Sequence, residues 1–220
     1  MSDTFLLAAR IPMSREGFER WLDTPAPGRD AITNPAAMFS GRYWDGQSAD
    51  GAWDAAGATP REFFGGLVEQ ACDGGPQSTV LLHREGALEA YLLRFGFAEE
   101  HVRTALLMFA GAGPVMAGPG DGTVLFWSET GANMLSADDD GWLSVLSVGP
   151  AEGRFVASAD LEAPVAALRP VEDLLFALIE RLGDEEDEWD ADAGPYRTDT
   201  PCDPAFVDPA VLTRKSYGSL

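Results

Sequence analysis

Hydrophobic and polar residues follow each other along this chain in patterns that predict both strands and helices. Six runs rich in aliphatic and aromatic residues predict strands, at residues 4–10, 79–84, 87–95, 123–128, 142–148 and 154–159. Glu85-Gly86 separates two of these runs and is typical of a two-residue hairpin turn. The pattern therefore predicts an antiparallel sheet that contains at least one tight hairpin.

Apolar residues at helical spacing begin directly after two capping signals. Ser14 is placed to cap a short helix that carries Phe18, Trp21 and Leu22 on one face. Thr59-Pro60-Arg61-Glu62 is a capping box with proline at the first helical position. Asp73-Gly74-Gly75-Pro76 is expected to end the helix that this box begins.

Two further helices complete the expected set. Residues 98–110 predict a buried helix, because its last turns are apolar nearly all round. Pro170 is expected to open another, whose apolar stripe runs to Leu182 and stops at Gly183. Because helices and strands are interspersed, we expect a mixed α+β fold with a mainly antiparallel sheet and about four helices.

The chain is expected to form one domain, residues 1–183, followed by an acidic and proline-containing segment, residues 184–220. The segment is not purely polar, and five of its side chains suggest that it folds back: Tyr196, Phe206, Val207, Val211 and Leu212. Asp203-Pro204 and Asp208-Pro209 each read as a capping Asp before a proline in the first turn.

The charge of the chain says more about its possible partners than any motif does. The chain has 36 acidic and 15 basic residues, a formal charge of -21 at neutral pH. Residues 1–120 hold 15 acids and 9 bases, whereas residues 121–220 hold 21 acids and 6 bases. Such a surface attracts cations and basic proteins and repels nucleic acids and anionic membranes. We therefore expect no nucleic-acid partner and no membrane partner.

The acid is most concentrated directly after the last predicted helix. Seven acids crowd around one tryptophan with no base among them: Asp184, Glu185, Glu186, Asp187, Glu188, Trp189, Asp190 and Asp192. Charge runs are usually solvated tails. Trp189 favours a second interpretation, because tryptophan is a common anchor in protein interfaces. We retain both, and name these eight residues as the predicted partner-binding segment.

Several familiar catalytic and cofactor motifs do not occur. Lys215 is the single lysine, so no glycine-rich loop here ends in the Gly-Lys-Ser/Thr of a P-loop. No Gly-x-Ser-x-Gly elbow and no Cys-x-x-Cys pair exist, and two histidines cannot supply a three-histidine zinc site. The glycines between Gly111 and Gly122 follow a helix and precede a strand, which is the wrong order for a dinucleotide loop. The sequence predicts neither a cofactor nor a metal.

A dispersed catalytic site is a separate interpretation. Cys72 pairs in principle with His83 or His101 as nucleophile and base, although it follows a helix C-terminus, where a thiolate is disfavoured. Asp138-Asp139-Asp140-Gly141 offers carboxylates for a divalent cation, but the sequence is also a plain turn signal. The residues alone do not decide whether any of these groups is catalytic.

The long connection of residues 23–58 carries large aromatic side chains, including Tyr43, Trp44 and Trp53. A loop of this length is usually functional or packed over the core. These three residues are therefore named as a pocket or lid, with core packing as the alternative, since aromatic residues dominate core burial.

The cysteine content and the first residues of the chain indicate the cellular compartment. Cys72 and Cys202 are too few for a secreted disulfide scaffold, and the start, Met1-Ser2-Asp3-Thr4, lacks the basic character of a signal peptide. No apolar stretch is long enough to span a membrane. We expect a soluble, cytoplasmic protein with reduced thiols.

Three functions remain open. The first is a non-catalytic acidic protein that binds and neutralises a basic protein partner, in the manner of a bacterial immunity or antitoxin inhibitor. The second is an enzyme with a dispersed hydrolytic or metal-assisted site. The third is an adaptor or chaperone-like protein with an acidic tail. We expect the first, and with it no catalytic residue. The sequence gives neither the identity of the partner nor the oligomeric state.

Overall fold

We describe the protein from a computed structural model of the full chain. The structure describes residues 5–35, 53, 55, 57–72, 79–95, 99–118, 120–128, 143–156, 166–174, 176, 177, 180 and 204–212.

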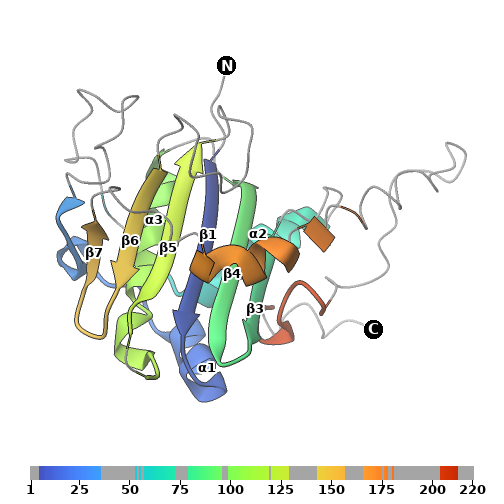
Figure 1. The fold of residues 1–220 in the computed structure, drawn as a ribbon, viewed down its shortest axis with the longest axis horizontal. Coiled ribbons are helices and arrows are strands. Elements are labelled where there is room, and N and C mark those ends of the chain that lie inside the picture. Colours follow the sequence, from blue (N-terminus) through green and yellow to red (C-terminus); the bar gives the residue numbers. More distant parts are fainter. Residues whose placement is uncertain are drawn as a thin grey trace, which may run out of the picture.

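Seven strands of the described residues form one sheet (Figure 1). They are β1 (Phe5–Pro12), β2 (Ile32–Thr33), β3 (Thr79–Arg84), β4 (Ala87–Phe95), β5 (Gly122–Ser128), β6 (Leu143–Val148) and β7 (Gly153–Val156). The order across the sheet is β2-β7-β6-β5-β1-β4-β3. Every neighbouring pair is antiparallel except β2 and β7, which are parallel.

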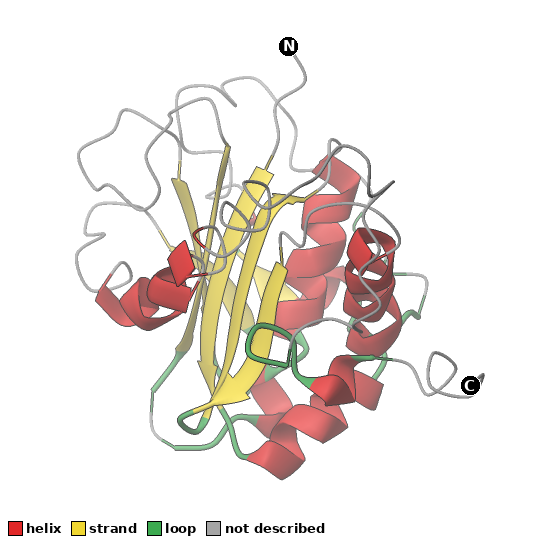
Figure 2. Cartoon of the chain, turned by 90° about the vertical axis from the view of Figure 1, so that its right-hand side faces the viewer, coloured by secondary structure: helices red, strands yellow, loops and turns green. Residues whose placement is uncertain are grey.

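Four α-helices among the described residues cover this sheet from both sides. They are α1 (Arg15–Asp23), α2 (Pro60–Cys72), α3 (Glu99–Ala110) and a fourth helix, whose described residues are 166–174, 176, 177 and 180. Figure 2 shows a group of helices against one face of the sheet and a single helix against the other. We call the face that packs on α1, α2 and α3 the first face, and the other the second face. The predicted α+β class with a mainly antiparallel sheet is confirmed.

Local signals set the predicted helix starts and the hairpin. The Ser14 side chain accepts a hydrogen bond from the backbone nitrogen of Gly17 at 3.0 Å, which caps α1. Thr59 and Glu62 satisfy each other's backbone nitrogens at 2.9 and 3.2 Å, the reciprocal bonds of a capping box. Glu85 and Gly86 both have positive φ, 51° and 73°, as a type I′ hairpin turn requires. All three predictions are confirmed.

The larger core lies on the first face. Alternate residues of the strands point to it, for example Leu7, Ala9 and Ile11 of β1, because side chains of a strand alternate between faces. Trp21 of α1 sits among these side chains, and its ring nitrogen donates to the Met108 carbonyl oxygen at 2.8 Å. The buried indole therefore keeps its one donor satisfied.

A smaller core lies on the second face, beneath the fourth helix. Ala8, Tyr91 and Leu125 of the sheet are buried there against Leu168 and Val171 of that helix. Figure 1 shows the fourth helix crossing in front of β1 and β4. The sheet is thus buried on both faces where this helix covers it.

Residues 204–212 return to the sheet and lie along the outer edge of β3. The Leu81 nitrogen donates to the Phe206 carbonyl oxygen, and the Asp208 nitrogen donates to the Leu81 carbonyl oxygen, both at 2.8 Å. Val207 joins the larger core and Phe206 the smaller one. The expectation that Phe206, Val207, Val211 and Leu212 fold back is confirmed, since all four are buried. Tyr196 and the boundary at residue 183 lie outside the described residues.

Two features differ from the sequence prediction. The short strand β2 was not expected, since two residues give no readable alternation. Pro170 does not open the fourth helix, because residues 166–169 are already helical. A proline lacks the N–H that would bond four residues back, and this loss is cheapest near a helix start. Proline position was therefore an imprecise guide to the start of this helix.

Candidate functional site

The residues named for partner binding from the sequence cannot be placed. The run Asp184 to Asp192, with Trp189 inside it, lies outside the described residues, as do Tyr43, Trp44 and the acids at Asp138 to Asp140. The chain on either side of the run belongs to the folded body, because the fourth helix reaches residue 180 and residues 204–212 pack on β3. The run is therefore joined to the body at both ends.

Trp53 is the one residue of the predicted pocket or lid that the structure describes. It is 7% exposed and packs edge-on against Phe155 of β7, with ring centroids 6.3 Å apart. The guanidinium of Arg103, on α3, lies 5.7 Å from the centre of the Trp53 ring. Trp53 thus contributes to the larger core.

The residues of the dispersed-site interpretation lie on separate elements. Cys72 is the last residue of α2, and His101 is exposed on α3. His83, on β3, is half-buried; its Nε2 lies 2.9 Å from the Met13 carbonyl oxygen and its ring lies against Phe18. In the described part of the chain, no group of three or more His, Cys, Asp or Glu side chains is arranged to hold a metal ion. None of the described helices is long and apolar enough to cross a membrane.

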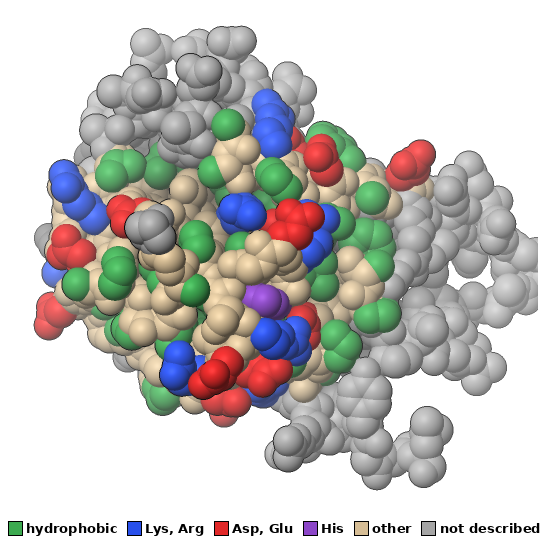
Figure 3. All heavy atoms as spheres, turned by 60° about the horizontal axis from the view of Figure 1, so that its bottom comes forward, with side chains coloured by type: hydrophobic (Ala, Val, Ile, Leu, Met, Phe, Trp, Pro, Cys, Tyr) green, Lys and Arg blue, Asp and Glu red, His purple; other side chains and the backbone are tan. Residues whose placement is uncertain are grey.

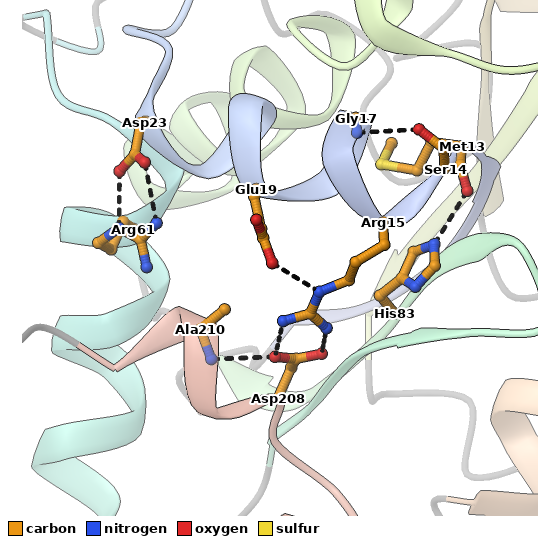
Figure 4. Close-up of polar contacts among 10 residues, drawn as sticks. All are labelled: Met13, Ser14, Arg15, Gly17, Glu19, Asp23, Arg61, His83, Asp208 and Ala210. Carbon is orange, nitrogen blue, oxygen red and sulfur yellow. Dashed lines mark hydrogen bonds and ion pairs between the residues drawn. The ribbon is translucent and has the colours of Figure 1, made fainter.

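A buried carboxylate holds residues 204–212 against the body (Figure 4). Asp208 accepts two hydrogen bonds from the Arg15 guanidinium, one of them from Nη2 at 3.0 Å, and one from the backbone nitrogen of Ala210 at 2.9 Å. Arg15 also donates to Glu19 at 2.8 Å. We call the pair Arg15–Asp208 the C-terminal clamp.

The clamp keeps Asp208 charged. Burial alone would raise the pKa of this carboxyl, but the hydrogen bonds from Arg15 and Ala210 and the charge of Arg15 outweigh burial. The pKa of Asp208 therefore lies below its ordinary value. The Asp208 hydrogen bond raises the pKa of Arg15, in agreement.

A second charged group lies on the second face, beside the fourth helix. Glu89 of β4 is fully buried, and its two carboxylate oxygens each accept from a different arginine. Arg10 Nε lies 3.2 Å from Oε1 and Arg84 Nε lies 2.8 Å from Oε2. Arg84 Nη2 also donates to the Pro170 carbonyl oxygen at 3.0 Å. We call Arg10, Glu89 and Arg84 the arginine–glutamate triad; it joins β1, β3 and β4 to the fourth helix.

Two more ionisable groups are buried under the same helix. Glu172 is 1% exposed and pairs with Arg169 through Oε2, while its Oε1 has no hydrogen-bond partner among the described residues. Burial raises the pKa of Tyr91 far above its ordinary value, and the nearby charge of Glu172 raises it further. Tyr91 therefore stays protonated throughout the physiological pH range.

The triad is one end of a row of polar side chains that crosses the second face. The pairing register places Arg10 directly beside Glu89 on one side and beside Thr123 on the other. Thr123 is beside Ser147, and Ser147 is beside Arg154. We call Glu89, Arg10, Thr123, Ser147 and Arg154 the polar row. Its members share a face, since each alternates with residues of the larger core.

Charge is unevenly divided between the described residues and the rest of the chain. The described residues hold 16 acids and 10 bases, a net charge of -6, so the remaining residues hold 20 acids and 5 bases, a net charge of -15. Several described bases form ion pairs with described acids: Arg10, Arg15, Arg20, Arg61, Arg84 and Arg169. Figure 3 shows acidic and basic side chains interspersed at one end of the body.

Sequence reasoning did not identify the clamp or the triad as pairs. Asp208 was recognised as a cap, which the 2.9 Å bond to Ala210 confirms, but its partner Arg15 is 193 residues away. One sequence signal could have indicated the triad. Arg10 and Glu89 are charged residues at inward-facing positions of two different predicted strands. In comparisons with known proteins, the chain matches no protein-family model, no curated protein and no solved structure.

Proposed function

We propose that this protein is a non-catalytic acidic binding protein that neutralises a basic protein partner, as an immunity or antitoxin inhibitor does. The contact surface would be the run Asp184 to Asp192, with Trp189 as its apolar anchor. The observation that carries the proposal is the concentration of acid in this run, where seven acids surround Trp189 with no base among them.

Three carboxylates of the body are used internally. Glu89, Asp208 and Glu172 are buried and paired with arginines, so these carboxylates support the fold. By contrast, residues 181–203 hold nine acids and two arginines, a net charge of -7. So strong a local excess raises the electrostatic free energy of the chain through self-repulsion. A basic partner would relieve this repulsion and gain steering toward the site.

The tryptophan inside the run favours binding by this segment over a purely solvated tail. Trp189 would supply the buried contact that acids alone do not, since exposed ion pairs contribute little to affinity.

The experiment is a capture from the native host at low salt, analysed by mass spectrometry, with three baits. The first is the wild-type chain, the second carries Trp189→Ala, and the third has Asp184, Glu185, Glu186, Asp187 and Glu188 replaced by Asn or Gln. A single dominant basic protein that is bound by the wild type and lost from both variants supports the proposal. A partner that is retained by both variants contradicts it, and a metabolite or metal that co-purifies favours an enzyme instead.

A further inference from the structure

The arginine–glutamate triad leaves some guanidinium nitrogens without a hydrogen-bond partner among the described residues. Arg10 uses Nε for Glu89, and its outer nitrogens Nη1 and Nη2 form no hydrogen bond with any described residue. Arg84 uses Nε and Nη2, which leaves Nη1. The two side chains are 28% and 35% exposed, so solvent reaches them. Three strong donors are thus held at the rim of the second face.

Neutralising Glu89 does not require this arrangement. Elsewhere in the chain one arginine satisfies one carboxylate through two parallel bonds, as Arg61 does for Asp23 at 2.7 and 3.0 Å. Arg15 holds Asp208 in the same way. At Glu89 each of two arginines gives a single Nε bond, so the outer edges remain available for a second acceptor. The triad holds one positive charge more than its own carboxylate balances.

Thr123 extends this surface along the polar row. It pairs directly with Arg10 in the sheet and is half-exposed, and its hydroxyl forms no hydrogen bond within the described part of the chain. The next member of the row, Ser147, differs, because its hydroxyl already donates to Asp121 at 2.6 Å. Among the described residues, the side-chain donors of the triad and the row that have no hydrogen-bond partner are therefore those of Arg10, Arg84, Thr123 and Arg154, and Arg154 lies beyond Ser147.

We propose that Arg10 and Arg84, which flank Glu89, form a binding site for an oxyanion, namely a carboxylate or phosphate group, with Thr123 at the edge of the site beside Arg10. Guanidinium edges bind such groups through charge-assisted hydrogen bonds. Buried Glu89 fixes both arginines before the ligand arrives, so little side-chain entropy is lost on binding. The site uses no residue of the acidic run, and the ligand it would bind is negatively charged whereas the proposed partner of the run is positively charged.

The test is a titration of the full chain with sodium phosphate and, separately, sodium acetate, at constant ionic strength set with sodium chloride. The readout is the NMR shift of the Thr123 amide and of the arginine Nε–H signals of Arg10 and Arg84. We expect saturable shifts at these three residues, with a dissociation constant in the millimolar range. Binding of phosphate alone identifies a phosphoryl ligand, and binding of both anions identifies a general oxyanion site.

Matched variants separate a site from general charge. Arg10→Gln should weaken binding about tenfold or more, the loss expected for one hydrogen bond to a charged group. Thr123→Val, which leaves the triad intact, should weaken it about tenfold, the low end for a hydrogen bond to a charged acceptor. Arg20→Gln removes the same charge from an exposed arginine 4.0 Å from Glu16 and should change affinity less than about twofold.

A further variant is expected to strengthen anion binding instead of weakening it. Asp121→Asn removes the carboxylate nearest to Ser147 while keeping an acceptor for its hydroxyl, and should tighten anion binding a few-fold. The proposal is overturned if neither anion gives saturable shifts at Thr123, Arg10 and Arg84. It is also overturned if Arg10→Gln and Arg20→Gln weaken binding equally, because the effect would then be one of net charge. If Arg10→Gln does not fold, Arg10→Lys is titrated in its place, because it keeps the positive charge but lacks the planar guanidinium group.

Discussion

The C-terminal clamp gives the sharpest stability prediction. Replacing Asp208 with Ala removes two hydrogen bonds with Arg15 and the cap on the short 3₁₀ helix η6 (Pro209–Val211). Loss of a cap costs about 1 kcal/mol. Loss of the charge-assisted pair costs about 1–2 kcal/mol, the low end for charged groups, because Arg15 is 46% exposed and water can solvate it afterwards. We expect a total of about 2–3 kcal/mol.

Asp23→Ala is the matched control. Asp23 also accepts two bonds from one arginine, Arg61, but its side chain is 65% exposed. Because exposed ion pairs contribute little, this variant should lose less than about 1 kcal/mol. Urea denaturation of the two variants and the wild type measures the difference in unfolding free energy directly.

Hydrogen exchange shows where the stability is lost. The amides of Leu81 and Asp208 form the two bonds that attach residues 204–212 to β3. Asp208→Ala should reduce protection at these amides by about 30-fold or more if the segment opens locally, since 2 kcal/mol corresponds to that factor. Equal unfolding free energies for the two variants, or unchanged protection at Leu81, would refute the reasoning.

The clamp also predicts a pH dependence with a definite sign. The folded-state pKa of Asp208 lies below its ordinary value, so its contribution is complete above the unfolded pKa, about 3.9, and is lost as pH falls through the folded pKa. The stability difference between wild type and Asp208→Ala should therefore be constant from about pH 5 upward and shrink below about pH 4. A difference that grows on acidification would contradict this assignment.

Three further predictions follow from the core, the glycines and the charge. Phe109 packs between Trp21 and Phe64, with ring centroids 6.1 and 5.2 Å away. Phe109→Ala should therefore lower the unfolding free energy by about 3–5 kcal/mol in a urea melt. Phe176→Ala, at a 47% exposed position, should lower it by less than about 0.5 kcal/mol. Gly113→Ala would place a Cβ atom 2.3 Å from the Gly149 carbonyl oxygen and should lower the melting temperature. Gly66→Ala, in open space on α2, should raise the melting temperature, because alanine stabilises the helix by about 0.5–1 kcal/mol. Equal effects of the two variants would contradict the packing described. The protein should give no gel shift with DNA or RNA at about 0.15 M salt, because a charge of -21 leaves too few bases to displace counterions.

Local chemistry made much of the fold predictable. Ser14, Thr59 and Glu62 act through bonds to backbone groups within three residues, so their positions in the sequence were sufficient to locate two helix starts. Glu85-Gly86 likewise determined the hairpin of β3 and β4. These signals act between neighbouring residues and do not depend on the rest of the chain.

The candidate site depends on long-range order that local patterns do not contain. Strand β1 lies between β4 and β5, and this order is what places Arg10 beside both Glu89 and Thr123. A shift of one residue in the register would turn Arg10 to the other face. The pairing of Arg15 with Asp208 likewise needs residues 204–212 to reach β3. Strand order and register therefore had to come from the structure.

The most direct test of the proposed function is the association rate of the captured basic partner, measured by surface plasmon resonance at two salt concentrations. The acidic-run variant has Asp184, Glu185, Glu186, Asp187 and Glu188 replaced by Asn or Gln. Its control has the same net charge and replaces five exposed acids of the body, none in an ion pair with any described residue: Asp30, Glu85, Glu152, Asp173 and Glu180.

Steering by the run predicts that the acidic-run variant associates about tenfold or more slowly at low salt and loses most of its salt dependence, while the control stays close to wild type. Trp189→Ala should instead speed dissociation, by about 30-fold if Trp189 is an anchor. Equal slowing of both charge variants would show that net charge alone drives association. Wild-type kinetics in both the acidic-run variant and Trp189→Ala would contradict the proposal that residues 184–192 bind the partner.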